Sequence, residues 1–508
     1  MNEQHFDVLI IGAGVSGIGM ACHLRRDCPG KSFAILERRQ SLGGTWDLFR
    51  YPGIRSDSDM FTFGYNFRPW VGGKVLADGA SIKQYVQETA REHDVDRHIR
   101  YGLAVKTADW SSVDKCWRVT AEHEATGETQ TYTANFLVGC TGYYNYDHGY
   151  TPDFPGESEF KGQIVHPQHW PEDLDYAGKK VVVIGSGATA ITLVPTMAEQ
   201  AGHVTMLQRS PTYLMPLPST DKLALGLQKV LPDSVAYKLT RARNVAISRF
   251  LYQRSRKSPR FMRRMFLGII KRQVNGQADM RHFTPDYDPW DQRLCVVKDG
   301  DLFTALKTGK ASIATDHIER FTETGIRLKS GEELEADIIV PATGLEIQML
   351  GGIKPTVDGQ AVLMKDKVIY KNVMVEGMPN AGMIFGYTNI SWTLKVDIAA
   401  EYLCRLMNLM DKRGYRVVMA RDTENSRGED TILGALNSGY VKRAADRLPR
   451  QGTHGPWKAS QNYLEDVKIL RFEPIEDGFL EFDGKRTHAS ARDTGGFLKP
   501  LRSALFGS

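Results

Sequence analysis

The chain has 508 residues, 42% of them hydrophobic and 25% charged, and its formal net charge is +5. This length exceeds what one hydrophobic core usually organises, so we expect several domains. The chain contains no run of eighteen apolar residues, the length that would predict a membrane-spanning helix. Its six cysteines form neither a CxxC pair nor a Cys/His cluster, which argues against a disulfide framework or a zinc site. We expect a cytoplasmic protein with no metal and no nucleic-acid partner.

A β-α-β unit is predicted at the start of the chain, from the strand FDVLIIG, a glycine turn, the helix SGIGMACHLRRD and the strand FAILE. In GAGVSG, Gly12 permits the tight turn, Gly14 lets the backbone approach a pyrophosphate, and Gly17 allows close helix packing. Glu37 lies 20 residues after Gly17, at the end of the second strand, where a carboxylate can accept bonds from ribose hydroxyls. The unit therefore predicts a dinucleotide site.

Strands are next predicted in IRYGLAVKTADW, CWRVTAEH and TQTYTANFLVGC. The segment from Tyr143 to Pro171 is rich in Pro, Gly and aromatic residues, which is typical of an interdomain linker.

A second β-α-β unit follows, from KKVVVIG through SGATAITLVPTMAEQ to HVTMLQR. Gly185 and Gly187 take the first two glycine positions, and Ala190 takes the third as a permitted variant. The last strand closes with Arg209 and Ser210 in place of an acidic residue, which favours NADPH because a carboxylate would repel the 2′-phosphate. The fold class we predict is α/β, with two Rossmann-like dinucleotide-binding domains.

A helical subdomain is predicted to interrupt the second unit, since residues 222–281 hold about fifteen Lys and Arg against two Asp. This basic insertion could be a solvated face, a lid over the substrate entrance or a weak peripheral contact with anionic membrane, and its pattern favours the first two. Strands resume at ASIATDHIERF and DIIVPATG, and TLKVDIAAEYLCRLMNLMDKRG predicts a helix that ends at a glycine.

Two short windows carry a family resemblance. GGTWDLFRYPGIRSD resembles the [A/G]GxWxxxx[F/Y]P[G/M]xxxD signature of Baeyer–Villiger monooxygenases at every fixed position. FKGQIVHPQHWP resembles the FxGxxxHxxxW[P/D] fingerprint of the type I enzymes through Phe160, Gly162, His166, Trp170 and Pro171. With WDQRLC and YTNISWTLK, the chain is similar over nearly its whole length to the ethionamide-activating branch of that family.

The resemblance implies FAD and NADPH as cofactors and O2 as co-substrate. It implies that a C4a-peroxyflavin attacks a ketone, for which linear aliphatic ketones are the expected class, and that the tetrahedral adduct rearranges to an ester. Sulfoxidation of thioethers or thioamides is the expected side activity. The alternatives are an N- or S-oxygenase of the flavin monooxygenase type and a flavoprotein without enzymatic activity.

The resemblance also places the site residues. Arg293 in DPWDQRLC takes the active-site arginine position, where its cation would stabilise the peroxide and the adduct, and Asp57 would orient it. We expect His166 to have a structural or domain-motion role. Gln292 stands where several family members carry a lysine near the 2′-phosphate, so NADPH preference leans on Arg209, Ser210 and Thr212.

The expected FAD-binding residues are Gly12, Gly14, Ser16, Gly17, Glu37, Thr45, Trp46, Asp57 and Val105, and the expected NADP-binding residues are Gly185, Ser186, Gly187, Ala188, Thr189, Ala190, Arg209 and Ser210. The expected order of domains is an FAD-binding part (1–145), the linker (146–172), an NADP-binding part (173–220), the basic helical insertion (221–289), a second NADP-binding part (290–345), and a second FAD-binding part with the C-terminal segment (346–508).

Overall fold

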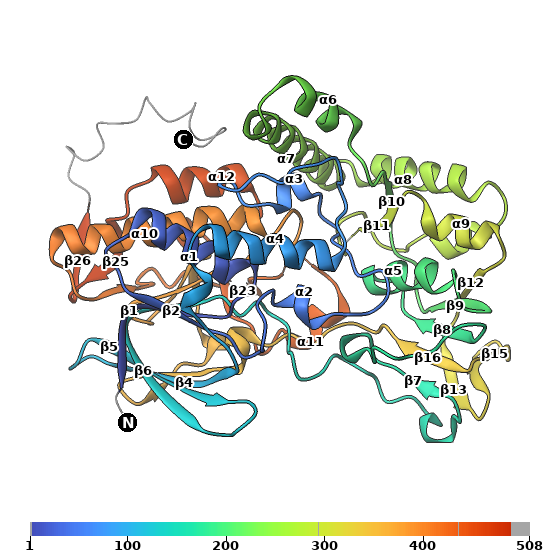
Figure 1. The fold of residues 1–508 in the computed structure, drawn as a ribbon, viewed down its shortest axis with the longest axis horizontal. Helices are drawn as coiled ribbons and strands as arrows, with labels where there is room; N and C mark the ends of the chain where they lie inside the picture. The colour runs from blue at the N-terminus through green and yellow to red at the C-terminus, as the bar shows by residue number, and fades with distance from the viewer. Residues whose placement is uncertain (1–2, 293, 435, 489–508) are drawn as a thin grey trace.

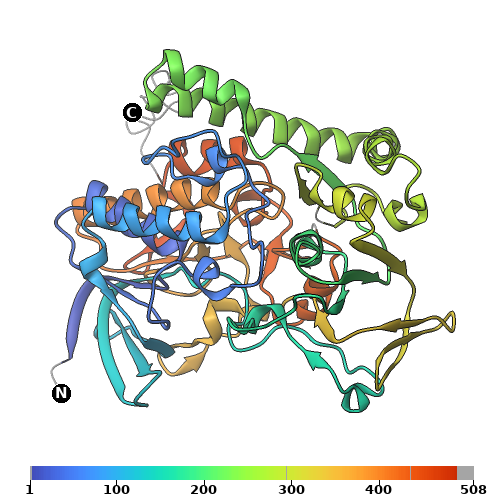
Figure 2. The same ribbon diagram turned by 45° about the vertical axis from the view of Figure 1, so that its right-hand side comes forward.

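The computed structural model describes residues 3–292, 294–434 and 436–488. Two lobes, each built on a sheet, lie side by side, and three helices cover them along one edge (Figures 1 and 2). The N- and C-terminal parts of the chain together form the first lobe, and the middle of the chain forms the second (Figure 1).

The first lobe is built on a nine-stranded sheet in the order β18-β17-β4-β5-β6-β1-β2-β3, with β21 also paired to β6. The strands β6, β1, β2 and β3 run parallel, whereas β4, β5 and β6 form an antiparallel meander. Val8, Leu9 and Ile10 in β1 are fully buried, as expected for a parallel strand covered on both faces. The strands are β1 (Gln4–Ile11), β2 (Phe33–Leu36), β3 (Ile99–Arg100), β4 (Leu103–Ser111), β5 (Cys116–His123), β6 (Thr129–Gly139), β17 (Lys354–Val357), β18 (Gln360–Ala361) and β21 (Ala381–Met383).

Helices α1 (Val15–Asp27) and α10 (Thr393–Arg413) pack against each other in this lobe, beside α4 (Gly79–Glu92). Asp78 caps α4 by accepting a bond from the Ser81 amide at 2.8 Å. The predicted stop of α10 is Gly414, which adopts φ 71°. Short helices α2 (Thr45–Leu48) and α3 (Met60–Phe63) carry the first signature and the segment after it.

The second lobe repeats the first unit on a smaller scale. Its all-parallel sheet has the order β12-β9-β8-β16-β7, with α5 (Ala188–Met197) following β8. The predicted α/β fold with two Rossmann-like units is confirmed. The other elements of this lobe are β7 (Gln163–Ile164), β8 (Lys180–Ile184), β9 (His203–Gln208), β12 (Ala311–Thr315), β16 (Ile338–Pro341), α9 (Asp301–Lys307) and the sheet of β13 (Ile318–Thr322), β14 (Gly325–Leu328) and β15 (Glu333–Glu335).

The predicted helical insertion leaves the second lobe between two paired parallel strands, β10 (Leu214–Leu217) and β11 (Cys295–Lys298). It consists of α6 (Lys222–Val230), α7 (Asp233–Lys257), α8 (Pro259–Val274) and a short 3-10 helix, Met280–Phe283. Helix α7 contacts α3 of the first lobe, and α8 contacts α9 and β10 of the second.

The C-terminal part returns to the first lobe as short elements around α10. They are β19 (Ile369–Tyr370), β20 (Met374–Val375), β22 (Val418–Ala420), β23 (Arg427–Thr431), α11 (Gly439–Ala444), β24 (Arg450–Gly452), α12 (Tyr463–Val467), a π-helical turn (Lys468–Phe472), β25 (Asp477–Phe482) and β26 (Lys485–His488). Among the described residues, no helix is both long and apolar enough to span a bilayer.

Candidate active site

The turn between β1 and α1 is shaped by its glycines. Gly12 adopts φ +101°, and a Cβ atom there would lie 2.7 Å from the Cys140 carbonyl oxygen. A Cβ atom on Gly17 would overlap the Gly12 carbonyl oxygen, so Gly17 lets α1 begin directly at the turn. Gly14, the N-cap of α1, carries no side chain that could cap the helix in place of a bound anion. The turn therefore offers the first amides of α1 to a phosphate group.

Glu37 follows β2, at the edge of this turn. Its side chain accepts bonds from the Ala13 amide at 2.7 Å and the Arg39 amide at 2.8 Å, and the residue is 5% exposed. Burial raises the pKa of Glu37, and the two amide bonds partly oppose that rise. These bonds fix the carboxylate at the mouth of the turn, where it can also accept bonds from ribose hydroxyls.

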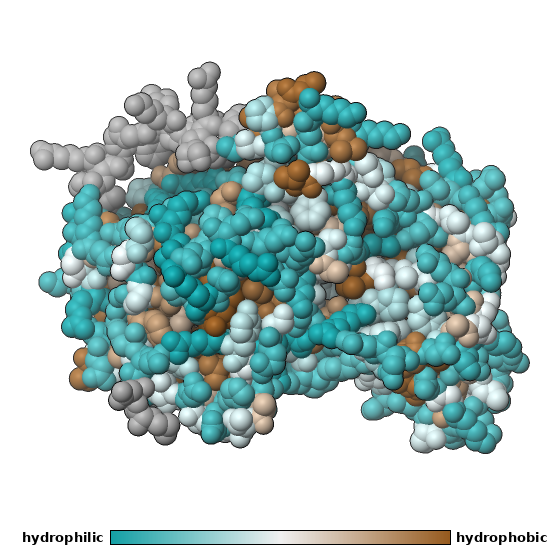
Figure 3. Space-filling view, viewed as in Figure 1, coloured by the Kyte–Doolittle hydropathy of each residue, from teal (hydrophilic) through white to brown (hydrophobic). Residues whose placement is uncertain are grey.

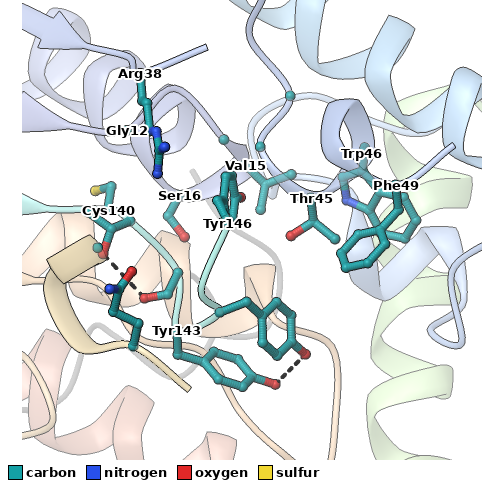
Figure 4. Close-up of a pocket in the computed structure, with 18 of the residues that line it drawn as sticks. Gly12, Val15, Ser16, Arg38, Thr45, Trp46, Phe49, Cys140, Tyr143 and Tyr146 are labelled. Atoms are coloured by element: carbon teal, nitrogen blue, oxygen red, sulfur yellow. Dashed lines mark hydrogen bonds between the residues drawn. The ribbon is translucent and has the colours of Figure 1, made fainter. Parts of the chain in front are cut away.

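A cavity of about 490 Å³ opens from this turn (Figure 4). That volume lies in the range of small-molecule and cofactor sites, roughly 300–1,000 Å³. The predicted FAD-binding residues that line it are Gly12, Gly14, Ser16, Glu37, Thr45, Trp46, Asp57 and Val105, and the predicted NADP-binding residues that line it are Ala188 and Thr189. None of the described residues that line the cavity comes from α6, α7 or α8. The cavity lining therefore does not support the interpretation of the insertion as a lid.

Aromatic side chains that the sequence reading did not single out complete the cavity wall. The Tyr143 and Tyr144 hydroxyls lie 2.7 Å apart in a hydrogen bond, dashed in Figure 4, and the Tyr143 ring stacks on Trp392 at 5.4 Å. The Trp392 indole donates to Ser16 Oγ at 2.8 Å. Tyr146 also lines the wall (Figure 4), and burial raises the pKa of its hydroxyl. Three of these tyrosines stand at the start of the segment that composition predicts to be a linker.

The first signature bridges the two lobes. The Tyr51 hydroxyl bonds with the Thr189 side chain, and a Cβ atom on Gly53 would overlap the side chain of Thr196, so both positions pack on α5. Arg55 donates from Nη1 to Asp301 Oδ2 at 2.7 Å, at the start of α9. These three positions, two residues apart, all contact the second lobe.

Asp57 lines the cavity two residues beyond Arg55. Burial raises the pKa of the Tyr51 hydroxyl, and the negative charge of Asp57 adds to that rise. Arg293, its predicted partner, lies outside the described residues. Of its described neighbours, Asp291 accepts a bond at its carbonyl oxygen from the Asn437 amide at 2.8 Å, and Leu294, directly before β11, is buried.

The turn after β8 repeats the first turn. Gly185 adopts φ +137°, and its amide donates to the Leu207 carbonyl at 2.8 Å, as the Gly12 amide donates to Leu36. Nothing lies within 4 Å of where a Gly187 Cβ atom would be, so a ligand can approach this backbone. Ala190, in the first turn of α5, is buried, and Ser186 Oγ donates to the Ser210 carbonyl at 2.9 Å. Arg209 is exposed at the end of β9.

The second fingerprint holds the connection between the lobes and does not line the cavity. His166 Nδ1 accepts from the Gln168 amide at 3.1 Å, and Gln168 in turn donates to the Asn145 carbonyl at 2.9 Å. Burial, with smaller contributions from His169 and His148, lowers the pKa of His166 to about 4, so the ring is neutral at pH 7. Phe160 and Trp170 pack against the second sheet, Pro171 is exposed, and a Cβ atom on Gly162 would overlap the Asp337 carbonyl.

Both nucleotides fit the residues present. The first turn has glycines at which a Cβ atom would overlap the backbone, and the buried carboxylate of Glu37 lies beside it. This combination suits a dinucleotide without a 2′-phosphate, such as FAD. The second turn has open backbone at Gly187 and a free-standing guanidinium in place of a carboxylate, which suits NADP. The cavity lies between the two turns, where the reactive ends of both cofactors could meet.

Comparison with known proteins gives consistent matches. A family described as flavin-binding monooxygenase-like matches residues 75–386, and one described as an NAD(P)-binding Rossmann-like domain matches residues 10–71. The probable FAD-binding monooxygenase AlmA of Acinetobacter baylyi is 57% identical over 97% of this chain and 99% of its own. The putative FAD-containing monooxygenase MymA of Mycobacterium tuberculosis is 58% identical (96% and 100%), and the FAD-containing monooxygenase EthA of the same organism is 52% identical (94% and 98%).

Solved structures share the fold at low sequence identity. An oxidized steroid monooxygenase bound to NADP superposes with a TM-score of 0.75 at 22% identity, covering 94% of this chain and 99% of its own. An open structure of cyclohexanone monooxygenase gives a TM-score of 0.74 at 18% identity, again covering 94% and 99%. The two lobes and the helical insertion thus form an arrangement already known in such enzymes.

Proposed function

Since the chain belongs to the flavin-binding monooxygenase family, and is therefore an NADPH-dependent FAD monooxygenase, we propose that it converts ketones to esters by the Baeyer–Villiger reaction. The family that the two signatures predict is confirmed by the close relatives. The reaction and the substrate class are the proposal: ketone, O2, NADPH and a proton give ester, water and NADP⁺, with linear aliphatic ketones as the substrates. We place this activity in the cytoplasm.

One observation carries the proposal: the YPGxxxD segment packs on α5 and α9 of the second lobe and ends with a carboxylate that lines the cavity. Tyr51 and Arg55 hold the segment to α5 and α9, while Asp57 lines the cavity. A ketone oxygenase must pass electrons from one nucleotide to the other and then admit a substrate at the same place. A segment fixed to both lobes positions a charged group for that sequence of events.

Bound FAD would supply the oxygen activation, because a flavin reduced by NADPH reacts with O2 to give the oxidant that adds to a ketone. The residues of this chain do the rest. Arg293 would hold the negative charge that develops on the substrate carbonyl oxygen, because a guanidinium stays protonated at any working pH. Asp57 would orient that guanidinium. The aromatic wall of Tyr143 and Trp392 would exclude water.

NADPH selection would rest on the end of β9. Arg209 is exposed there, and Ser210 is held by the bond between its carbonyl and Ser186 Oγ. Gln292 carries no charge, so we propose that Arg209 alone supplies the cation for the 2′-phosphate.

A second candidate is oxygenation at sulfur or nitrogen, favoured by the family match over residues 75–386, which describes flavin-binding monooxygenases without restriction to ketones. Oxygen transfer to a thioether needs no carbonyl adduct. It would therefore depend less on Arg293 and Asp57 than ketone oxidation does.

The test incubates the purified yellow protein with NADPH and 2-decanone in air and identifies products by gas chromatography, beside a thioether. Arg293→Ala and Asp57→Ala are compared with Arg320→Ala, an exposed arginine that pairs with Glu159 in the second lobe. We expect ester from the wild type and from Arg320→Ala, and a loss of at least about 10²-fold in both cavity variants, the size seen when one stabilising group is removed. Anaerobic bleaching of the flavin by NADPH should survive Arg293→Ala. Sulfoxide from the thioether, with only hydrogen peroxide from every ketone, would assign the second candidate.

A further inference from the structure

Exposed apolar side chains gather on the helical insertion. Most of the large hydrophobic side chains that are exposed in the described part of the chain lie on α6, α7 and α8: Leu223, Val230, Val235, Leu239, Ile247, Phe250, Phe261 and Ile269. Val71, also exposed, lies in a loop whose Gly73 packs closely against Leu225 of α6. In Figure 3 hydrophobic side chains, coloured brown, gather at the top of the molecule, where α6 and α7 lie in Figure 1. A cluster of this kind marks an interaction surface, whereas single exposed hydrophobics need no explanation.

Helix α7 shows why packing within the protein does not account for them. Its inner face holds the buried Tyr237 and Arg241, and Arg241 donates to the carbonyls of Phe61 at 3.0 Å and Gly64 at 2.6 Å. Val235, Leu239 and Phe250 recur at helical spacing on the outer side, and Phe250 is 65% exposed. One face of α7 is therefore anchored, and a second apolar face is left uncovered by the rest of the described chain.

Many cations lie on the same three helices. Residues 222–274 include fourteen Lys and Arg and a single Asp, and Arg254 lies 5.6 Å above the exposed Phe261 ring. Some of these cations serve the fold, such as Arg243, which pairs with Asp221. The exposed ones are Lys222, Lys229, Arg254, Arg256, Lys257, Arg260, Arg264, Lys271 and Arg272. The rest of the chain carries a net negative charge, so the excess of positive charge lies in this segment.

We propose that α6, α7 and α8 form a docking surface for an anionic phospholipid bilayer, the interfacial surface, with the helices lying along the lipid headgroups. Apolar side chains that project between cations match the two layers of such a membrane, which presents phosphate charge above acyl chains. A nucleic acid would match the cations but not the exposed Phe250, Phe261 and Val230. None of the described residues of these helices lines the cavity, so we expect substitutions on this surface to leave the reaction unchanged.

The experiment uses the full-length, FAD-loaded protein and vesicles of phosphatidylcholine with or without phosphatidylglycerol, whose anionic headgroups attract basic segments. Flotation measures the bound fraction at low and high salt. The test variant is Ile247→Glu with Phe250→Glu. The control is Val113→Glu, which replaces a side chain that is 91% exposed in the turn between β4 and β5. Flavin content and far-ultraviolet circular dichroism confirm that each variant is folded.

We expect the wild type and Val113→Glu to float with anionic vesicles and to bind neutral vesicles weakly. Both should detach in about 0.5 M salt, because salt screens the attraction between the cations and the lipid phosphates. The Ile247→Glu, Phe250→Glu variant should bind at least about tenfold more weakly, since two apolar anchors are lost. Wild-type protein that stays in solution with anionic vesicles, or a test variant that binds as well as the control, would overturn the proposal. So would a dimer in solution that this variant dissociates, because a second copy would then occupy the surface. NADPH oxidation should be equal in all variants, which separates this test from that of the reaction.

Discussion

Gly12 and Gly185 occupy the same place in two successive nucleotide turns. Both have positive φ, at +101° and +137°, and both approach a carbonyl oxygen at the end of a neighbouring strand. An alanine at either position would be strained and would displace that strand end. We expect Gly12→Ala to lower FAD affinity at least about tenfold, and Gly185→Ala to keep the flavin but raise the NADPH concentration needed for its reduction by a similar factor.

Flavin absorbance after purification and stopped-flow reduction measure these two effects. Gly30→Ala is the control, because nothing lies within 4 Å of a Cβ atom there. A Gly12→Ala protein that retains full flavin would show that the first turn does not hold the cofactor.

His166 makes a prediction about pH. Its pKa is lowered to about 4, chiefly by burial, so the folded protein binds this proton less readily than the unfolded chain, whose imidazole has a pKa near 6.5. The contribution to stability is therefore complete above about pH 6.5 and is lost as the pH falls toward 4. We expect urea titrations to show a steeper fall in the free energy of unfolding over this window for the wild type than for His166→Asn. His317→Asn, at an exposed position, should keep the wild-type slope.

At the scale of elements, the buried Arg241 anchors α7 to the first lobe beside Tyr237, whose hydroxyl donates to the Tyr65 carbonyl at 3.0 Å. Arg241 donates to three backbone carbonyls after and within α3 and to Asp397 at 3.2 Å, so its loss would leave a carboxylate buried without that cation. We expect Arg241→Met to lower the free energy of unfolding by about 3–5 kcal/mol, as for a broken buried ion pair. Arg256→Met, which removes an exposed pair with Asp291, should cost no more than about 1 kcal/mol. Equal losses in urea melts would show that α7 is held by other contacts.

The β-α-β units could be predicted because their signals are local. A buried strand, a glycine turn and a helix start lie within thirty residues in each unit, and the structure shows both. The cavity wall is different, because it joins segments far apart in the chain. Tyr143 meets Trp392 only through the pairing of β21 with β6, and no periodicity near Tyr143 indicates it. The bridging role of Arg55 was missed for the same reason, since its partner Asp301 is more than two hundred residues away.

At the scale of the whole molecule, the proposed reaction requires the two lobes to hold their nucleotides in a fixed relative position. Arg55 is 7% exposed in its side chain, and its Nη2 finds no hydrogen-bond partner among the described residues, so the bond from Nη1 to Asp301 is its principal anchor. Burial raises the pKa of Asp301, and Arg55 opposes that rise. We expect Asp301→Asn to leave FAD content unchanged and to slow flavin reduction by NADPH about tenfold or more, because a small misplacement between reacting groups is costly.

Stopped-flow reduction under anaerobic conditions measures that rate. Glu172→Gln, which weakens an exposed pair between Arg50 and the linker, is the matched control and should reduce at the wild-type rate. Unchanged reduction in Asp301→Asn would mean that the lobes are aligned without this bond.

The most direct test of the central claim is to follow the oxygen atoms. The wild-type protein is incubated with NADPH and 2-decanone under ¹⁸O2, and the ester is examined by mass spectrometry. A Baeyer–Villiger monooxygenase places one labelled atom in the alkoxy position of the ester and one in water, with one NADPH consumed per ester formed. Labelled hydrogen peroxide as the sole oxygen product with every ketone tried, or ester without label, would contradict the account.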